Sequence, residues 1–238
     1  MCLIVFSWKL LPQCPLLLAA NRDEFFDRPA QAAGWWEEHP GVYAGRDLRA
    51  GGTWLGIDRN GRFAAITNIR NGHAPAQEKR SRGELVANFL SGDLDTAAYL
   101  EHVRETGDQY NGFNLIFGDE HGMYWVSNDD PSSFRALEPG IYGLSNGSLD
   151  TPWPKVVRAK AQFASLLCQG APDDAYFEML CDTTRAADSR LPDTGVSLEW
   201  ERLLSPICIE SDDYGTRAST IVRVLDGGRA ELRERVIR

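Results

Sequence analysis

Apolar residues occur in short runs along the first half of the chain, and turn-forming residues separate the runs. Residues 2–8 (CLIVFSW) and 15–21 (PLLLAAN) are almost continuously apolar, which is typical of strands buried on both faces. A turn that contains Pro12 lies between them, so the pattern predicts a buried hairpin. Further strands are predicted at 42–47 and within 53–68.

Turn and capping signals set the boundaries of several elements. Asn60-Gly61 lies between two alternating runs and favours a hairpin turn, because both turn positions need positive φ. Ser81 and Glu84 have the spacing of a capping box, in which the serine caps free N–H groups and the glutamate reaches back. In chain order, the remaining pattern predicts helices at 81–90 and 94–105, strands at 113–119, 122–129 and 140–146, helices at 153–167 and 174–181, a loop at 183–199, and a hairpin of 217–226 and 229–238 around Gly227-Gly228.

The order of these elements decides the fold class. Strands come in runs and do not alternate one for one with helices. This order predicts an α+β architecture rich in antiparallel pairs, with helices packed on the faces of the sheets. The chain shows no internal repeat, low-complexity tract or clear linker, so residues 1–238 are predicted to form one domain.

Charge and cysteine usage exclude several classes of function. The formal net charge of −9 argues against a nucleic-acid binder and against binding to an anionic membrane. The five cysteines are scattered without a C-x-x-C pair, and no histidines have H-x-x-x-H spacing, so we expect reduced thiols and no metal site. The apolar start lacks a basic segment and is interrupted by Lys9 and Pro12, unlike a signal peptide. No run of 18 apolar residues occurs, so we expect a cytoplasmic protein without a transmembrane helix.

Cys2 is the first candidate for chemistry. Removal of Met1 would place a free α-amine on the residue that carries the thiol. Such an amine has a pKa of about 7.7–8.0, so it can act as a general base near neutral pH. The alternative interpretation is that Cys2 is a small buried apolar residue that opens a strand.

The stretch Asn21–Glu24 (NRDE) directly follows the second apolar run. If the first two strands pair, these polar side chains lie beside Cys2 at the edge of a sheet. Arg22 can then bind a substrate carboxylate or hold the thiolate, and Asp23 can orient the amine. Asn21 and Glu24 are candidates for substrate contacts. The alternative is a solvated cluster of charges at the end of a strand.

Four more positions are candidates. Asn68 and Asn146 each end a predicted strand, where a side-chain amide can donate to a developing oxyanion, although asparagine is also an ordinary turn residue. Arg217 opens a late strand and can supply a positive charge. Trp54 lies among the small residues of AGGTWLG, which either let a ligand approach the backbone or form a tight bend.

Seven segments, taken in order, resemble the NRDE family, which includes the transport and Golgi organization protein two homologues. The segments are MC, ANRDEFFDRP, AGGTWLG, TNIR, SRGELV, GLSNGSLDTPWPKV and TRASTIV, and they span nearly the whole chain. The resemblance implies a four-layer αββα sandwich of the Ntn-hydrolase type, with two antiparallel sheets between helices. The family is distantly similar to choloylglycine hydrolases and penicillin V acylases. Those enzymes lose their initiator methionine and use the resulting N-terminal cysteine as nucleophile.

On this resemblance, Cys2 matches the nucleophile, and Asn68 and Asn146 fall near the positions of the oxyanion hole. Arg217 falls near a late catalytic arginine. The related enzymes separate their arginine and aspartate, whereas Arg22 and Asp23 are adjacent, so the roles within Asn21–Glu24 stay open. The resemblance thus implies a hydrolase of non-peptide C–N amides, with thioesters as further substrates.

Two other functions remain open. The family is linked to haem handling and to lipid or acyl-CoA metabolism, which implies a non-catalytic carrier of an amphipathic ligand. No cofactor is predicted, and haem would be a carried ligand in that case. A scaffold in membrane trafficking has only the family's name as support, because the chain shows no heptads, basic amphipathic helix or lipidation motif. The oligomeric state is not predicted.

Overall fold

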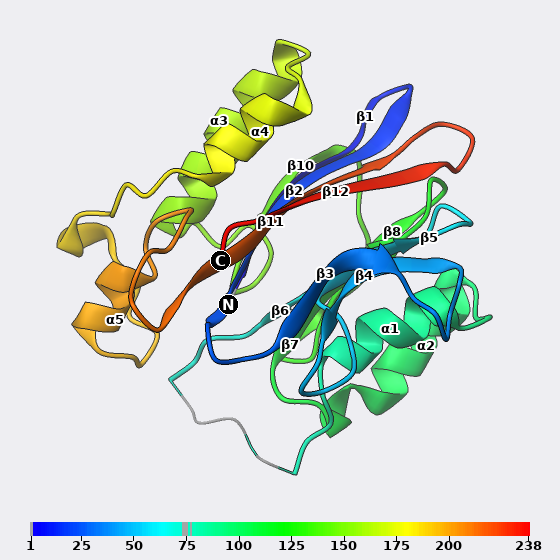
Figure 1. Ribbon diagram of the computed structural model, residues 1–238, viewed down its shortest axis with the longest axis horizontal. Helices are drawn as coiled ribbons and strands as arrows, with labels where there is room; N and C mark the ends of the chain where they lie inside the picture. The colour runs from blue at the N-terminus through cyan, green and yellow to red at the C-terminus, as the bar shows by residue number, and fades with distance from the viewer. Residues whose placement is uncertain (1, 73–75, 77) are drawn as a thin grey trace.

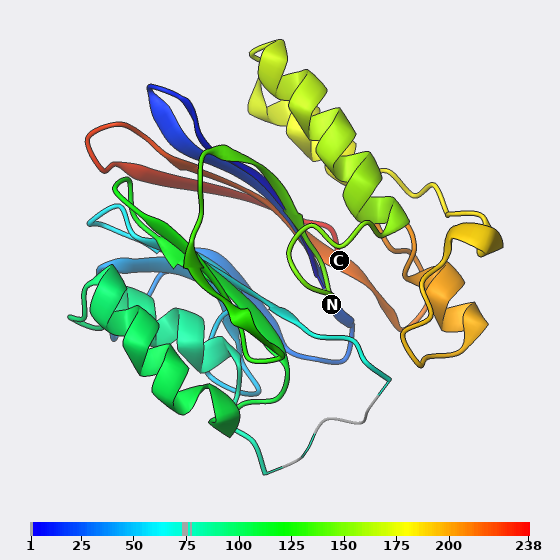
Figure 2. The same ribbon diagram turned by 180° about the vertical axis from the view of Figure 1, so that it is seen from behind.

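The computed structural model describes residues 2–72, 76 and 78–238. The predicted removal of Met1 concerns a residue that lies outside the described part. Two antiparallel sheets face each other, and a pair of helices covers the outer face of each sheet (Figure 1; Figure 2). The predicted α+β class and its αββα layering are therefore confirmed. Among the described residues, no helix combines the length and the apolar character that crossing a bilayer requires.

The two sheets differ in width, and all of their strand pairs are antiparallel. The first sheet has the order β10 (Gly140–Leu144), β1 (Cys2–Leu11), β2 (Cys14–Phe25), β11 (Tyr214–Val224) and β12 (Ala230–Val236). The second has the order β3 (Ala30–Trp35), β4 (Val42–Asp47), β5 (Leu55–Asp58), β6 (Phe63–Asn68), β7 (Phe113–Gly118), β8 (Met123–Ser127) and β9 (Asp130–Ala136).

Helices complete the outer layers. The first sheet packs against α3 (Pro154–Cys168) and α4 (Asp173–Leu180), and the second against α1 (Gly83–Ser91) and α2 (Thr96–Thr106). A short helix, α5 (Leu198–Leu203), lies beside the end of the first sheet (Figure 1). Two 3₁₀ turns, Gly107–Gln109 and Asp188–Arg190, complete the helical segments of the described residues.

The side chains of β1 alternate between two apolar clusters. Ile4 and Phe6 pack between the two sheets, and Leu3 and Val5 pack against α3 and α4. Burial of such a side chain contributes about 1.5–3 kcal/mol. Because a strand covered on both faces needs apolar residues at every position, the continuous run CLIVFSW is the expected pattern.

Both predicted hairpins with glycine turns are present, although Asn60 does not have the positive φ that the prediction gave it. Gly61 has φ of 80° between β5 and β6, and Gly227 and Gly228 have φ of 86° and 76° between β11 and β12. The prediction missed β3 and β9, which are the two edge strands of the seven-stranded sheet. Edge strands have one unpaired side and tolerate small and polar residues, so their sequences show little strand pattern.

The predicted capping box is wrong. Arg82 is the N-cap of α1, and no side chain caps the helix. Glu84 instead binds Arg80, with 2.7 Å between the guanidinium and carboxylate groups. Because α1 starts two residues after Ser81, Ser81 is not at the N-cap position, and the Glu84 carboxylate pairs with the Arg80 guanidinium.

The segment predicted as the loop 183–199 is fixed by a buried ion pair. Arg70, which follows β6, lies 3.0 Å from Glu201 of α5, and both side chains are at least nine-tenths buried. The Arg70 guanidinium also lies over the ring of Trp153, 4.5 Å from its centroid. Glu201 additionally accepts hydrogen bonds from Thr194, so one carboxylate connects the loop, α5 and β6.

We expect Glu201→Gln to loosen this segment. The change removes the charge that compensates buried Arg70, which costs about 1–3 kcal/mol. Limited proteolysis should therefore cut within residues 183–197 faster than in the parent chain. Glu199→Gln is the matched control, because Glu199 is an exposed acid of the same helix. Equal cleavage rates for the two variants would show that the ion pair does not hold the loop.

Candidate active site

Cys2 and Arg22 are direct neighbours across the β1–β2 pair, so the hairpin brings the stretch Asn21–Glu24 beside Cys2. Cys2 is partly exposed and opens β1. Burial raises the pKa of the Cys2 thiol, and the Asp23 carboxylate acts in the same direction, whereas Arg22 lowers it. The Arg22 side chain lies over Trp54, with its guanidinium carbon 4.1 Å from the ring centroid.

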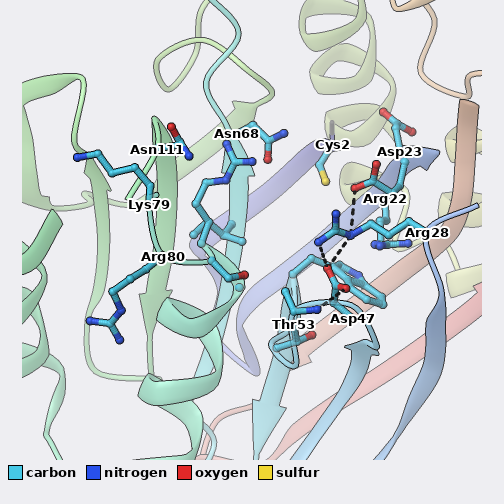
Figure 3. A pocket seen from close by; sticks show the side chains of 17 residues that line it. Cys2, Arg22, Asp23, Arg28, Asp47, Thr53, Asn68, Lys79, Arg80 and Asn111 are labelled. Carbon is cyan, nitrogen blue, oxygen red and sulfur yellow. Dashed lines mark hydrogen bonds and ion pairs between the residues drawn. The ribbon is translucent and has the colours of Figure 1, made fainter. Parts of the chain in front are cut away.

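A cavity of about 300 Å³ opens beside Cys2 (Figure 3). It lies where the ends of β1, β2 and β6 meet the loop that precedes α1. Most of its lining is polar or charged. The lining residues are Cys2, Arg22, Asp23, Glu24, Arg28, Asp47, Ala50, Thr53, Trp54, Ile66, Asn68, Lys79, Arg80, Ser81, Arg82, Gly83 and Asn111.

Asp23 belongs to a buried network that sequence reasoning did not find. Its carboxylate accepts a hydrogen bond from the Thr216 hydroxyl at 2.7 Å and lies 4.0 Å from the Lys155 ammonium. The side chains of Asp23 and Lys155 are 0% and 2% exposed. Burial raises the pKa of Asp23 while Lys155 opposes that change, and burial lowers the pKa of Lys155.

Asn21 points away from the charged cavity lining. Its amide nitrogen donates to the carbonyls of Leu180 (2.8 Å) and Ile207 (2.9 Å), and its oxygen accepts from the Ser219 hydroxyl (2.6 Å). These bonds fasten the end of α4 and a following segment to the sheet. Its predicted contact with substrate stays a prediction.

The two predicted oxyanion asparagines take different positions. Asn68, at the end of β6, lines the cavity with Cys2, and the two come from facing sheets (Figure 3). Asn146 is fully buried, and its side-chain amide donates to the backbone carbonyl of Asn68 at 2.9 Å. The Ser145 hydroxyl lies 2.9 Å from the Cys2 carbonyl and 3.2 Å from the Asn146 side-chain oxygen. Asn146 thus connects the backbones that carry Cys2 and Asn68.

Arg217 is not among the residues that line this cavity. It lies in a bulge of β11, because Thr216 pairs with Asp23 and Ala218 pairs with Arg22, which leaves Arg217 without a partner in the β2 register. Its guanidinium donates to the backbone carbonyls of Phe25 and Arg28. The structure therefore places Arg217 at the turn after β2, and its catalytic role, which the resemblance implied, stays a prediction.

Glu24 and Trp54 line the cavity as expected. Glu24 lies 3.9 Å from Arg28, which pairs more closely with Asp47 at 2.7 Å. The Trp54 ring packs on Gly45, where a Cβ atom would lie only 2.4 Å from it. The ring that supports Arg22 thus requires a glycine on β4.

Sequence reasoning also missed the basic residues before α1. Lys79, Arg80 and Arg82 all line the cavity, from a segment interpreted only as a helix start. The signal was present as three basic residues within four positions, but no local pattern connects them to Cys2. Within residues 2–72, 76 and 78–238, no three His, Cys, Asp or Glu side chains gather as metal ligands would.

The layers and the site together define an αββα sandwich protein with a cysteine at the start of an inner strand and a charged cavity beside it. The chain belongs to the Transport and Golgi organisation 2 family, whose model matches residues 1–238. The family membership expected from the seven sequence segments is thereby confirmed.

Curated relatives match along almost their whole length. The Transport and Golgi organization protein 2 homologue of Bos taurus is 38% identical over 99% of this chain and 92% of its own. The Homo sapiens homologue is 36% identical over the same shares of the two chains. The Drosophila melanogaster protein is 27% identical over 94% of this chain and 88% of its own.

Among solved structures, the chain is similar to a Caenorhabditis elegans N-acylethanolamine-hydrolyzing acid amidase orthologue, at 11% identity and a TM-score of 0.47 over 92% of each chain. It is also similar to a mutant conjugated bile acid hydrolase of Clostridium perfringens, at 9% identity and a TM-score of 0.46 over 100% of this chain and 92% of that one.

Proposed function

We propose that this chain is an N-terminal cysteine hydrolase of non-peptide C–N amides, with thioesters as further substrates, and that it acts after removal of Met1. One observation carries the proposal: the Cys2 thiol, the Arg22 guanidinium and the Asn68 amide line a single polar cavity. A nucleophile, a cation and an oxyanion donor around one space are the groups that acyl transfer requires. Because all five cysteines are free thiols, we place the enzyme in the reducing cytosol.

The reaction proceeds in two steps. The α-amine of processed Cys2 accepts the thiol proton, and the thiolate attacks the substrate carbonyl to form a C–S bond. The Asn68 amide stabilises the oxyanion, and Asn146 holds the backbone that carries Asn68. The protonated amine then donates its proton to the leaving nitrogen as the C–N bond breaks. Water, deprotonated by the amine, attacks the thioester and releases the acid and the thiol.

Arg22 and Asp23 support these steps from opposite faces of β2. Arg22 lies beside Cys2 in the sheet, where its charge stabilises the thiolate. Asp23 faces Lys155 and Thr216, and in the processed chain its carboxylate orients the α-amine.

The test of activation is thiol labelling of two forms of the chain. One form is released from a cleavable tag with Cys2 first, and the other retains a glycine before Cys2. In the extended form, burial raises the pKa of Cys2 above that of an ordinary thiol, so its labelling rate should keep rising into alkaline pH. In the processed form, the α-amine accepts the proton, so we expect labelling at pH 7 to be at least about tenfold faster.

Cys168 is the internal reference, because it is exposed and free in both forms. Peptide mapping after brief treatment with iodoacetamide reports both sites at once. Equal labelling of Cys2 and Cys168 in the processed form would contradict an activated nucleophile. A carrier of haem or an acyl-CoA-type ligand would then become the leading hypothesis. Among the described lining residues, however, few are apolar, and Trp54 and Ile66 are the large apolar side chains.

A further inference from the structure

We propose that the substrate carries an anionic group, a carboxylate or a phosphate, and that Arg82 binds this group inside the cavity. The inference rests on the proposed function in one respect, because it places the substrate beside Cys2. The supporting observations are the excess of basic side chains in the cavity lining and the absence of acidic partners for some of them among the described residues.

The cavity is basic although the chain is acidic. Five basic and three acidic side chains line it, in a chain with a net charge of −9. All three acids already lie near a cation: Asp47 and Glu24 lie 2.7 Å and 3.9 Å from Arg28, and Asp23 lies 4.0 Å from Lys155, which does not line the cavity. The space beside Cys2 therefore attracts anions.

Three of the lining cations, Lys79, Arg22 and Arg82, have no acidic partner in the described part of the chain. Arg80 pairs with Glu84, and Lys79 donates to the Asp108 carbonyl. Arg22, only 6% exposed, lies over Trp54, and no described carboxylate or carbonyl accepts a hydrogen bond from its guanidinium. Arg82 donates to a single backbone carbonyl, that of Gly112, at 3.2 Å.

Arg22 is buried and Arg82 is partly exposed. A guanidinium that loses hydration without gaining a counter-ion is costly, because it stays protonated in proteins. Burial lowers the pKa of both Arg22 and Arg82, which reflects that cost. Cys2 and Glu24 act on the Arg82 guanidinium in the opposite direction, so this cation lies within electrostatic reach of the nucleophile. A bound anion would compensate the charge at the place where the substrate must lie.

The two arginines come from opposite halves of the sandwich. Arg22 belongs to β2 of the first sheet, and Arg82 directly precedes α1 on the second. Gly83, the first residue of α1, lines the same wall, and the N-terminus of a helix favours an anion in addition to the arginine. An oxyanion held by Arg82 leaves Arg22 free to act on the Cys2 thiolate. The fork of Arg82 suits a carboxylate and a phosphate equally.

Three amides with one acyl chain test this inference. N-octanoylethanolamine is neutral, N-octanoylglycine ends in a carboxylate, and N-octanoyl-phosphoethanolamine ends in a phosphate. Binding is measured by calorimetry on Cys2→Ala, so no turnover is needed. We expect at least one anionic amide to bind about 10- to 100-fold more tightly than the neutral one. The tighter of the two identifies the anion as carboxylate or phosphate.

Arg82→Gln, in the same Cys2→Ala background, should reduce this preference to near unity. Arg82→Lys keeps the positive charge but loses the bidentate guanidinium geometry, so it should retain part of the preference for the anionic amide. This variant also tests the inference if Arg82→Gln fails to fold. Arg104→Gln is the control for the change in net charge, because Arg104 is an exposed residue of α2 outside the cavity. It should leave the preference unchanged.

Equal or tighter binding of the neutral amide, or no binding of any of the three, would overturn the inference. Turnover of the same amides by the processed chain is a separate measurement. Selective binding without turnover would support the anion site and contradict the hydrolase. Turnover that favours N-octanoylethanolamine would support the hydrolase and contradict the anion site.

Discussion

Cys2→Ala in the processed chain is expected to reduce amide hydrolysis by at least about 1000-fold, because the substitution removes the thiol that forms the acyl-enzyme bond. Substrate affinity should change little, since the cations of the cavity stay in place. The measurement is release of the free amine under single-turnover conditions, together with intact mass to detect the acylated chain. A processed Cys2→Ala chain that hydrolyses an amide at the parent rate would rule out the proposed nucleophile.

Two further variants make this result specific. Cys2→Ser keeps a nucleophilic oxygen, and we expect a low but measurable rate, because a hydroxyl needs more help from the base than a thiol does. Cys168→Ala removes a free thiol from the exposed end of α3 and should leave the rate unchanged. Loss of activity in Cys168→Ala as well would indicate general damage to the chain.

Lys155→Met is expected to destabilise the fold by about 3–5 kcal/mol at pH 7, because it leaves Asp23 as a buried carboxylate without its cation. Urea denaturation measures the free energy of unfolding. Lys160→Met is the matched control on the same helix, since Lys160 forms a partly exposed pair with Asp150 and should contribute no more than about 1 kcal/mol. A similar loss for both variants would mean that the Asp23–Lys155 pair has no special weight.

The same variant has a predicted pH dependence. Burial raises the pKa of Asp23, and loss of Lys155 raises it further, because Lys155 lowers it in the parent chain. A raised carboxyl pKa contributes stability below the unfolded pKa of about 3.9, and this contribution is lost as the pH rises through the folded pKa. The deficit of Lys155→Met relative to the parent should therefore be smaller at pH 4.5 than at pH 8.

A second substitution tests the same pair at constant pH. Asp23→Asn added to Lys155→Met removes the buried carboxylate that has lost Lys155 and should recover part of the lost stability. An additive loss in the double variant would contradict direct coupling of the two charges. Because Asp23 also belongs to the proposed site, stability and not activity is the readout here.

Local patterns in the sequence were sufficient for much of the framework. The continuous run of β1, the glycine turns and the positions of α3 and α4 depend on neighbours close in the chain, and each was predicted within a few residues. The position of Asn21–Glu24 near Cys2 also follows locally from the predicted hairpin, but the exact pairing of Cys2 with Arg22 depends on a register shift between Trp8 and Leu11 that the pattern does not reveal. The αββα layering came from the family resemblance, which uses the order of seven segments.

The sequence by itself thus determined the strands, the hairpins and the neighbourhood of Cys2, whereas only the tertiary structure decided the chemistry of the cavity wall. Asp23 meets Thr216 across 193 positions, and Arg82 reaches the cavity from a different sheet. Arg217 is displaced by a bulge that changes the register by one residue. Such contacts depend on how separate sheets and helices pack, and a period of two or 3.6 residues carries no information about that packing.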